Sequence, residues 1–243
     1  MKIILLIFIS IFVSSCSSNY NWGWYILDPT LEQGLDNLYF LISGFWLTIS
    51  ISLTSIFISL IVGFLVAVPG FSKNKFLRIA NRIYIEFFRA IPLLVLLLWI
   101  YYGLPVVFGL TIGAFAAGII SLSLSDSAFE AEIFRAGIQS ISIGQKDAAK
   151  SIGLNKFQEM RLIILPQAVR VILPAIGNQF VYVLKMSSLV SIIGLADLTR
   201  KANELVVTVY RPLEIYSFLV LEYLFLIVII SYLIRRLERR LKI

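Results

Sequence analysis

The stretch GQKDAAKSIGLNKFQEMRLIILPQA, from Gly144 to Ala168, decides the fold class because it interrupts an otherwise membrane-like chain. It is too polar to cross a bilayer and too short to form a domain of its own. Two polar, helix-favouring segments meet at Gly153 and are closed by Pro166. We interpret the stretch as a docking surface that membrane helices carry on one side of the bilayer.

The composition supports this interpretation, because the chain has 243 residues of which 59% are hydrophobic and only 14% are charged. Soluble proteins are usually about 25% charged, so this chain is predicted to be an all-α integral membrane protein. Its net charge of +7 fits basic cytoplasmic loops better than nucleic-acid binding. With no histidine and one cysteine, the chain offers neither a metal cluster nor the commonest general base. We therefore predict no metal site and no enzyme.

Five apolar regions are expected to span the membrane, at residues 44–68, 87–102, 106–124, 162–195 and 215–234, the fourth broken by prolines. Lys and Arg gather in the connecting segments 69–85 and 135–161 and in the tail 235–243. After residue 16, the segments expected on the other side of the membrane carry only three basic residues, Arg200, Lys201 and Arg211. The positive-inside rule then predicts an N-terminus outside and a C-terminus in the cytoplasm.

The first 16 residues form a signal-like or signal-anchor segment, since one lysine precedes an apolar run too short for a full span. Val13-Ser14-Ser15-Cys16 resembles a bacterial lipobox, which would make Cys16 a lipidation site. The alternative is an uncleaved signal anchor with an incidental cysteine. Residues 17–39 are expected to be extracytoplasmic, residues 40–234 to form the membrane domain, and residues 235–243 to be a basic cytoplasmic tail.

The opening stretch also predicts its own local structure. Ser142 and Gln145 match a capping box, in which each side chain satisfies a backbone N–H of the other residue. Gly153 suits the left-handed position after a helix, and Asn155 suits the start of a second one. The small side chains of Ala148 and Ala149 would allow a partner's groove to approach the helix closely. A solvated loop helix is the plainer alternative.

The residues Asp147-Ala148-Ala149, Gly153, Ile163 and Leu165-Pro166 match the pattern EAA-x3-G-x9-I-x-LP. This chain therefore resembles the permease subunits of bacterial ABC importers, with Asp in place of the usual first Glu. The flanking words EIFRAGIQSISIGQ and LPQAVRVILPAIGNQFVYVLKMSSL resemble the polar amino acid branch of that family. The resemblance covers about residues 40–234.

The resemblance implies a multi-pass protein of the bacterial cytoplasmic (inner) membrane, with a five-span permease core that pairs with a second, identical or related, permease subunit. Two cytoplasmic ATPase subunits would dock on the coupling loop, and an extracytoplasmic binding protein would deliver a polar amino acid. This chain has no G-x4-GK-[ST] phosphate loop, so ATP would be bound by the partner and this chain would hold no cofactor. The residues expected to contact the ATPase are Gly144, Gln145, Asp147, Ala148, Ala149, Gly153 and Leu154.

Polar residues within apolar regions are costly and often functional, so they are candidates for the substrate path. They are Lys185, Ser187, Ser188, Asn178 and Glu132. Two plainer roles compete: Lys185 as an interfacial anchor in contact with membrane lipid, and Glu132 as an ion-pair partner of Arg135. An ATP-independent amino acid carrier or channel is the alternative function, and the coupling-loop pattern argues against it.

Overall fold

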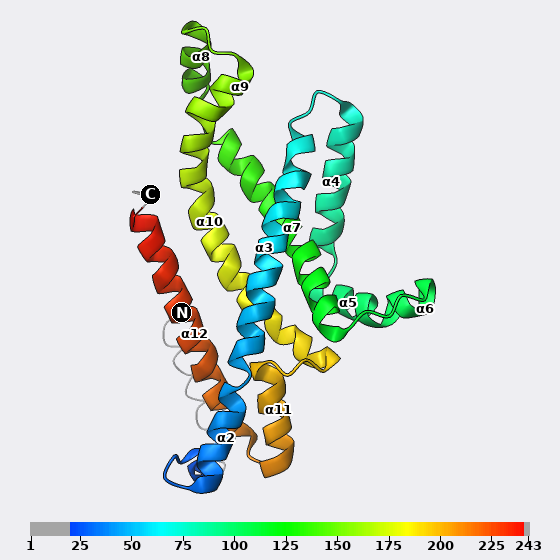
Figure 1. Ribbon diagram of the computed structural model, residues 1–243, viewed down its shortest axis with the longest axis vertical. Helices are drawn as coiled ribbons and strands as arrows, with labels where there is room; N and C mark the ends of the chain where they lie inside the picture. Colours follow the sequence, from blue (N-terminus) through cyan, green and yellow to red (C-terminus); the bar gives the residue numbers. More distant parts are fainter. Residues whose placement is uncertain (1–19, 241–243) are drawn as a thin grey trace, which may run out of the picture.

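A computed structural model describes residues 20–240, and every regular element in that range is helical (Figure 1). The expectations for residues 1–16, Cys16 included, lie outside the described residues. The α-helices are α2 Glu32–Ile42, α3 Phe45–Gly70, α4 Lys75–Ala90, α5 Leu93–Leu98, α6 Leu104–Phe108, α7 Ala114–Gln139, α8 Ile143–Ser151, α9 Lys156–Gln158, α10 Leu165–Met186, α11 Leu198–Val209 and α12 Pro212–Arg240. Two 3₁₀ segments, η1 Trp24–Leu27 and η4 Ser187–Ile193, and two π-helical segments, η2 Trp99–Gly103 and η3 Glu159–Ile164, complete the order.

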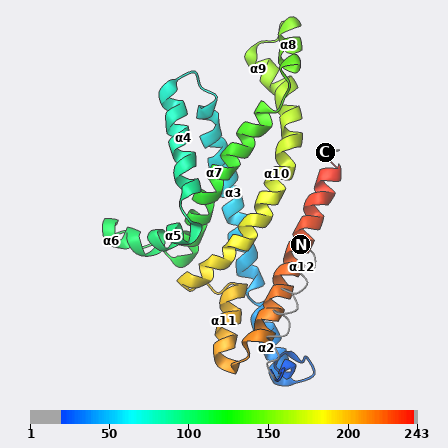
Figure 2. The same ribbon diagram turned by 180° about the vertical axis from the view of Figure 1, so that it is seen from behind.

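The molecule is elongated, with α8 and α9 at one end and α2 and α11 at the other (Figures 1 and 2). Helices α3, α7 and α10 run between the two ends, and α5 and α6 project sideways as an arm. Three continuous helical segments are long and apolar enough to cross a membrane: Glu32–Gly70, Lys156–Ile193 and Pro212–Arg240. Within residues 20–240, a fourth span is counted only if α4 and the arm are taken together, although they meet at an angle of 97°.

The expected spans at 87–102 and 106–124 are therefore wrong in their boundaries. Helix α4 stops at Ala90 because Pro92 disfavours helical backbone at the preceding residue, and Ile91 is extended with ψ 125°. Gly109 takes a left-handed conformation with φ 67° and ends α6, so the next long helix begins only at Ala114. That helix, α7, continues to Gln139, well beyond the predicted end.

The fourth region is one continuous helical run rather than the broken span that its prolines suggested. Pro166 lies where the π-helical segment η3 passes directly into α10, and the helical run continues through it although proline has no backbone N–H to donate. Pro174 lies inside α10 without ending it, which packed membrane helices tolerate. Helix α12 confirms the expected last span and extends it to Arg240.

Small side chains hold α3 against α7, the most extensive helix pair in the molecule. A stripe of buried small residues at spacings of three or four lines α3: Thr48, Ser52, Ser55, Ser59, Gly63 and Ala67. A Cβ atom on Gly63 would lie 2.6 Å from the Cβ of Glu130 on α7. Ser59 also donates a 2.5 Å hydrogen bond to Asp126. Small residues thus allow the two backbones to approach closely along this interface.

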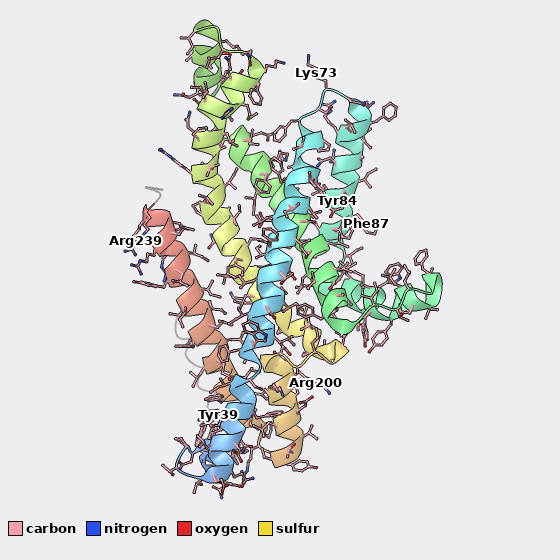
Figure 3. The ribbon with its side chains drawn as sticks, in the orientation of Figure 1. Tyr39, Lys73, Tyr84, Phe87, Arg200 and Arg239 are labelled. Atoms are coloured by element: carbon pink, nitrogen blue, oxygen red, sulfur yellow. The ribbon has the colours of Figure 1, made fainter. Side chains whose placement is uncertain are left out.

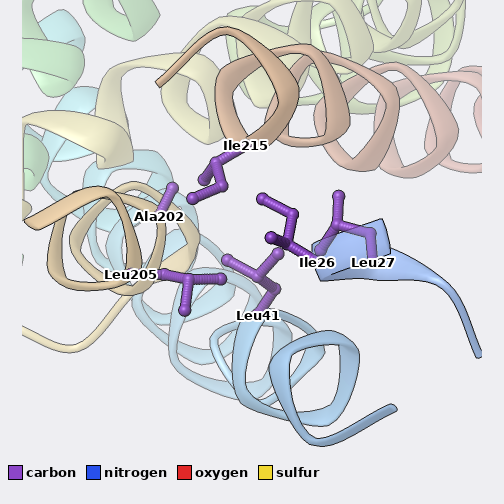
Figure 4. Packing of buried hydrophobic residues seen from close by; sticks show 6 residues of the cluster. All are labelled: Ile26, Leu27, Leu41, Ala202, Leu205 and Ile215. Atoms are coloured by element: carbon purple, nitrogen blue, oxygen red, sulfur yellow. The ribbon is translucent and has the colours of Figure 1, made fainter. Parts of the chain in front are cut away.

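Residues 20–44, which precede α3, belong to the folded domain rather than forming a separate tail. Its side chains Ile26, Leu27 and Leu41 are buried against residues of α11 and α12 (Figure 4). Asn37 donates a 2.9 Å hydrogen bond to the carbonyl of Ile26, which fixes η1 on α2. At this end the fold depends on contacts between residues far apart in the chain.

Candidate functional site

Residues 142–158, here called the coupling hairpin, form the tip of the molecule beyond the long helices (Figure 1). Helix α8 ends in a Schellman motif: Leu154 N–H donates to the Ala149 carbonyl at 3.1 Å, and Gly153 N–H donates to the Lys150 carbonyl at 2.9 Å. Gly153 has φ 81°, as its position predicted. Its left-handed backbone turns the chain from α8 into α9.

The second helix of the hairpin is capped as expected, but the first is not. The Asn155 side chain accepts from the backbone N–H groups of Phe157 and Gln158, and the Gln158 side-chain oxygen accepts from the Asn155 backbone N–H. Ser142 occupies the cap position of α8 without making a side-chain cap bond. Gln145 instead contacts the amide of Gln167 on α10, at 3.4 Å. The predicted capping box at Ser142 and Gln145 is wrong, because Gln145 faces α10.

The two alanines of the hairpin face opposite ways. Ala148 is exposed, whereas Ala149 is 2% exposed and faces the protein's own chain. A close approach by a partner is therefore available at Ala148 and not at Ala149. Gly144, Gln145, Asp147 and Gly153 are exposed, Leu154 is half-buried, and Asp147 pairs with Lys150 at 3.1 Å.

Three exposed apolar side chains on the hairpin were missed by sequence reasoning. Ile143, Ile152 and Phe157 are 74%, 73% and 71% exposed. The signal for them was an apolar residue beside each helix end in an otherwise polar stretch. Large apolar groups fixed in this way on a capped projection suit burial in a partner's cleft.

The candidate substrate-path residues are not brought together. Lys185 is exposed in the last turn of α10 and makes no ion pair with residues 20–240. The hydroxyls of Ser187 and Ser188 donate to carbonyls of their own helix, at 2.7 and 2.8 Å. Asn178 is exposed midway along α10. Glu132 lies near the other end of the bundle, on α7, and pairs with Arg135 at 2.5 Å as its spacing predicted.

Glu132 lines a cavity of about 360 Å³ between α4 and α7 that carries both signs of charge. Sequence reasoning missed the α4 side of this cavity, although charged residues recur there at helical spacing. Guanidinium groups suit a carboxylate, and Glu side chains suit an ammonium group, so the lining fits a zwitterion. The lining residues are Gly70, Arg78, Asn81, Arg82, Ile85, Glu86, Arg89, Glu132 and Arg135.

Known proteins share both the sequence and the shape of this chain. The glutamine transport system permease protein GlnP of Escherichia coli K12 is 37% identical over 207 residues, covering 84% of this chain and 93% of that protein. A solved amino acid ABC transporter, determined with histidines, contains a chain that is 38% identical with a TM-score of 0.83, covering 91% of this chain and all of its own. The inward-facing MetNI methionine ABC transporter shares the fold at 21% identity and a TM-score of 0.70.

The family described as "Binding-protein-dependent transport system inner membrane component" matches residues 59–243. That range includes the coupling hairpin and four of the long helices in part or in full. Together with the amino acid transport relatives, the match excludes an ATP-independent carrier. The chain belongs to the family of binding-protein-dependent transport system inner membrane components, as a permease of an amino acid ABC transporter.

Proposed function

We propose that the coupling hairpin binds in the cleft of a cytoplasmic ATPase subunit. When the two ATPase subunits close on ATP, the hairpin transmits this movement to α7 and α10. The exposure of Ile143, Ile152 and Phe157 on a capped hairpin is the observation that carries this proposal. Gly144, Gln145, Asp147, Ala148 and Gly153 are the other exposed residues of this contact, and Ala149 and Leu154 support it from behind. Two ATPase subunits, a second permease subunit and an extracytoplasmic binding protein complete the importer.

The transported substrate in this proposal is a polar amino acid of the glutamine type. Support comes from the relative named for glutamine transport and from the cavity of mixed charge at Glu132. Lys185, Ser187 and Ser188, at the opposite end of the bundle, form the entrance where the substrate carboxylate leaves the binding protein. Asn178 lies on α10, between the Lys185 entrance and the level of the mixed-charge cavity at Glu132.

The proposed orientation has the α8 end in the cytoplasm of a bacterial cell and the α2 end outside. Lys73 and Arg239 lie toward the α8 end, while Tyr39 and Arg200 lie at the α2 end (Figure 3). Basic residues of short connecting segments favour the cytoplasmic side, which supports this assignment. The C-terminal tail is then cytoplasmic.

Reconstitution tests the function directly. Vesicles that contain the permease and its ATPase are expected to take up a polar amino acid under one condition. ATP must be on the side of the membrane that carries the ATPase, and the binding protein must be on the opposite side. A panel of amino acids with and without ATP identifies the substrate. Uptake at the same rate without the ATPase would contradict the proposal.

Labelling of single cysteines tests the orientation in a background where Cys16 is replaced by serine. A cysteine at Lys150 should react with an impermeant maleimide only after the inner membrane is opened. A cysteine at Asp36 should react in intact spheroplasts, and its exposure makes it preferable to Asn37, whose side chain holds η1. Reaction at position 150 from outside would overturn both the orientation and the ATPase contact.

A further inference from the structure

Two carboxyl groups one turn apart on α7 are buried, but only one of them has side-chain hydrogen-bond partners. Asp126 is 2% exposed and accepts 2.5 Å hydrogen bonds from the Ser59 hydroxyl on α3 and from the Gln179 amide on α10. Glu130 is fully buried, and neither of its carboxyl oxygens has a partner within residues 20–240. Because residues four apart share one face of a helix, an acceptor with partners and an acceptor without one follow each other along α7.

The carboxyl group of Glu130 needs a hydrogen-bond donor, because a buried polar group without a partner is costly. The packing around it leaves little room for a ligand, since a Cβ atom on Gly63 of α3 would lie 2.6 Å from the Glu130 Cβ. A donor that comes from the protein itself explains the group better. The Gln179 amide, one turn away at Asp126, is such a donor.

Helix α10 has the means to shift along α7. It continues directly from the π-helical segment η3, and π-helical turns inside helices are frequent at functional sites. Because α7 ends and α10 begins at the coupling hairpin, the two helices are antiparallel. Movement of α10 toward the hairpin would carry Gln179 from Asp126 to Glu130, which is one helical turn or about 6 Å along α7.

The packing between α7 and α10 suits a shift of this size. Ile172 of α10 fills the space beside Gly137 of α7. Ile176 follows four residues later and packs against the same cluster, so the same kind of side chain would take that space after the shift. The number of side-chain hydrogen bonds also stays equal, because Ser59 keeps Asp126 while Gln179 exchanges one carboxyl group for the other. Two alternative arrangements of one packed element are the basis of a switch.

We propose that Gln179 is a two-position donor, bonded to Asp126 in this structure and to Glu130 when closure of the ATPase has moved α10. Glu130 is then a positioning residue for transport, because it stabilises the second position of α10 without touching the substrate. The inference rests on the proposed function, in which the coupling hairpin transmits the movement of the ATPase.

Spin labels on α7 and α10 of the reconstituted complex measure the shift. In a Cys16→Ser background, the labels replace the exposed residues Ala116 and Val171, which lie on opposite sides of the bond between Asp126 and Gln179. Counted from that bond, the labels are ten residues away on α7 and eight on α10, or roughly 27 Å apart along the helices. Dilution with unlabelled permease keeps the distance within one copy. A non-hydrolysable ATP analogue should lengthen it by about 6 Å.

Three variants identify the second acceptor. Glu130→Met is similar in length and has no carboxyl oxygen, so the distance should stay at its ATP-free value and uptake should fall about fivefold, as for one lost hydrogen bond. Glu130→Gln keeps an oxygen acceptor and should retain the lengthening and most of the uptake. Glu222→Met is the matched control, because Glu222 on α12 is also buried without a partner in the described range 20–240. It should lengthen the distance as the wild type does, and failure to do so would mean that loss of any buried carboxyl blocks the shift.

The thermal midpoint distinguishes a positioning role from a structural one. Because Glu130 makes no bond in this arrangement, Glu130→Met should leave the midpoint of the ATP-free permease unchanged or raise it. A lower midpoint, or lengthening by the methionine variant as in the wild type, would overturn the switch. A fixed distance in a wild-type complex that performs ATP-driven uptake would overturn it while the proposed function stands. A wild-type complex without ATP-driven uptake would refute the proposed function and this inference with it.

Discussion

The coupling hairpin and the α3–α7 pair both use glycine, but Gly153 and Gly63 serve different purposes. Gly153 supplies a left-handed backbone in a hairpin whose internal hydrogen bonds join residues at most five positions apart, and nothing lies within 4 Å of its missing Cβ. Gly63 has no unusual φ and is needed because Glu130 and Ser127 of α7 occupy the space of a side chain. The hairpin leaves apolar side chains exposed for a partner. In the α3–α7 pair, atoms of α7 already occupy the space that a side chain at Gly63 would need. The same substitution should therefore cause loss of stability in one region and loss of coupling in the other.

The largest effect is expected for Gly63→Leu. Its Cβ alone would lie 2.6 Å from the Glu130 Cβ and 2.9 Å from the Ser127 carbonyl oxygen, so α3 and α7 must separate. Overpacking of this kind costs about 3 kcal/mol, which would lower the thermal midpoint of the purified permease by about 10 °C. Scanning fluorimetry in detergent measures the midpoint.

Gly113→Leu is the matched control, because Gly113 precedes α7 with an ordinary φ of −62° and no atom within 4 Å of its missing Cβ. The same side chain should there leave the midpoint almost unchanged. Equal destabilisation by the two variants would show that the close approach of α3 and α7 is not what holds the bundle.

Gly153→Val should leave the bundle stable but uncouple ATP hydrolysis from transport. A β-branched residue strongly disfavours φ 81°, so α9 would leave its position relative to α8. A strain of about 1–2 kcal/mol corresponds to roughly a tenfold fall in the population of the docked hairpin and in uptake. Uptake and ATPase activity of the reconstituted complex, compared at equal amounts of assembled protein, measure the coupling.

Asn is the control at the same position, since it tolerates the left-handed region better than valine does. Gly153→Asn should retain much of the uptake that Gly153→Val loses. Uptake by the valine variant at the wild-type rate would remove the hairpin from the coupling mechanism.

The same contrast explains what could be predicted from the sequence. Gly153 and Asn155 were identified correctly because their roles depend on neighbours within a few positions. The turn at Ile91 and Pro92 was missed because hydropathy continues across it while the backbone changes direction. Ala149 and Gln145 face their own chain because of contacts with distant residues, which the local pattern does not reveal. The charged lining of α4 was overlooked because Arg78 and Arg82 also satisfy the positive-inside rule.

A smaller effect is expected at Lys185. If its charge meets the substrate carboxylate, Lys185→Met should lower uptake about fivefold, or ~1 kcal/mol, while insertion and ATPase binding persist. A snorkelling anchor instead predicts near-normal uptake for both Lys185→Arg and Lys185→Gln. Uptake of the three variants, normalised to assembled complex, separates the roles, and near-normal uptake by the methionine variant would remove Lys185 from the path.

The smallest effect distinguishes the two helix starts inside the hairpin itself. Asn155 caps α9 through two backbone N–H groups, so Asn155→Ala should cost about 1 kcal/mol locally. Ser142 makes no such bond to α8, so Ser142→Ala should cost only a few tenths of that. Hydrogen exchange measured by mass spectrometry on peptides covering 142–158 reports both changes in the assembled complex. Faster exchange in the Asn155 variant alone is the expected result. Equal acceleration in both would mean that Ser142 does cap α8, and that the hairpin follows its sequence pattern at both ends.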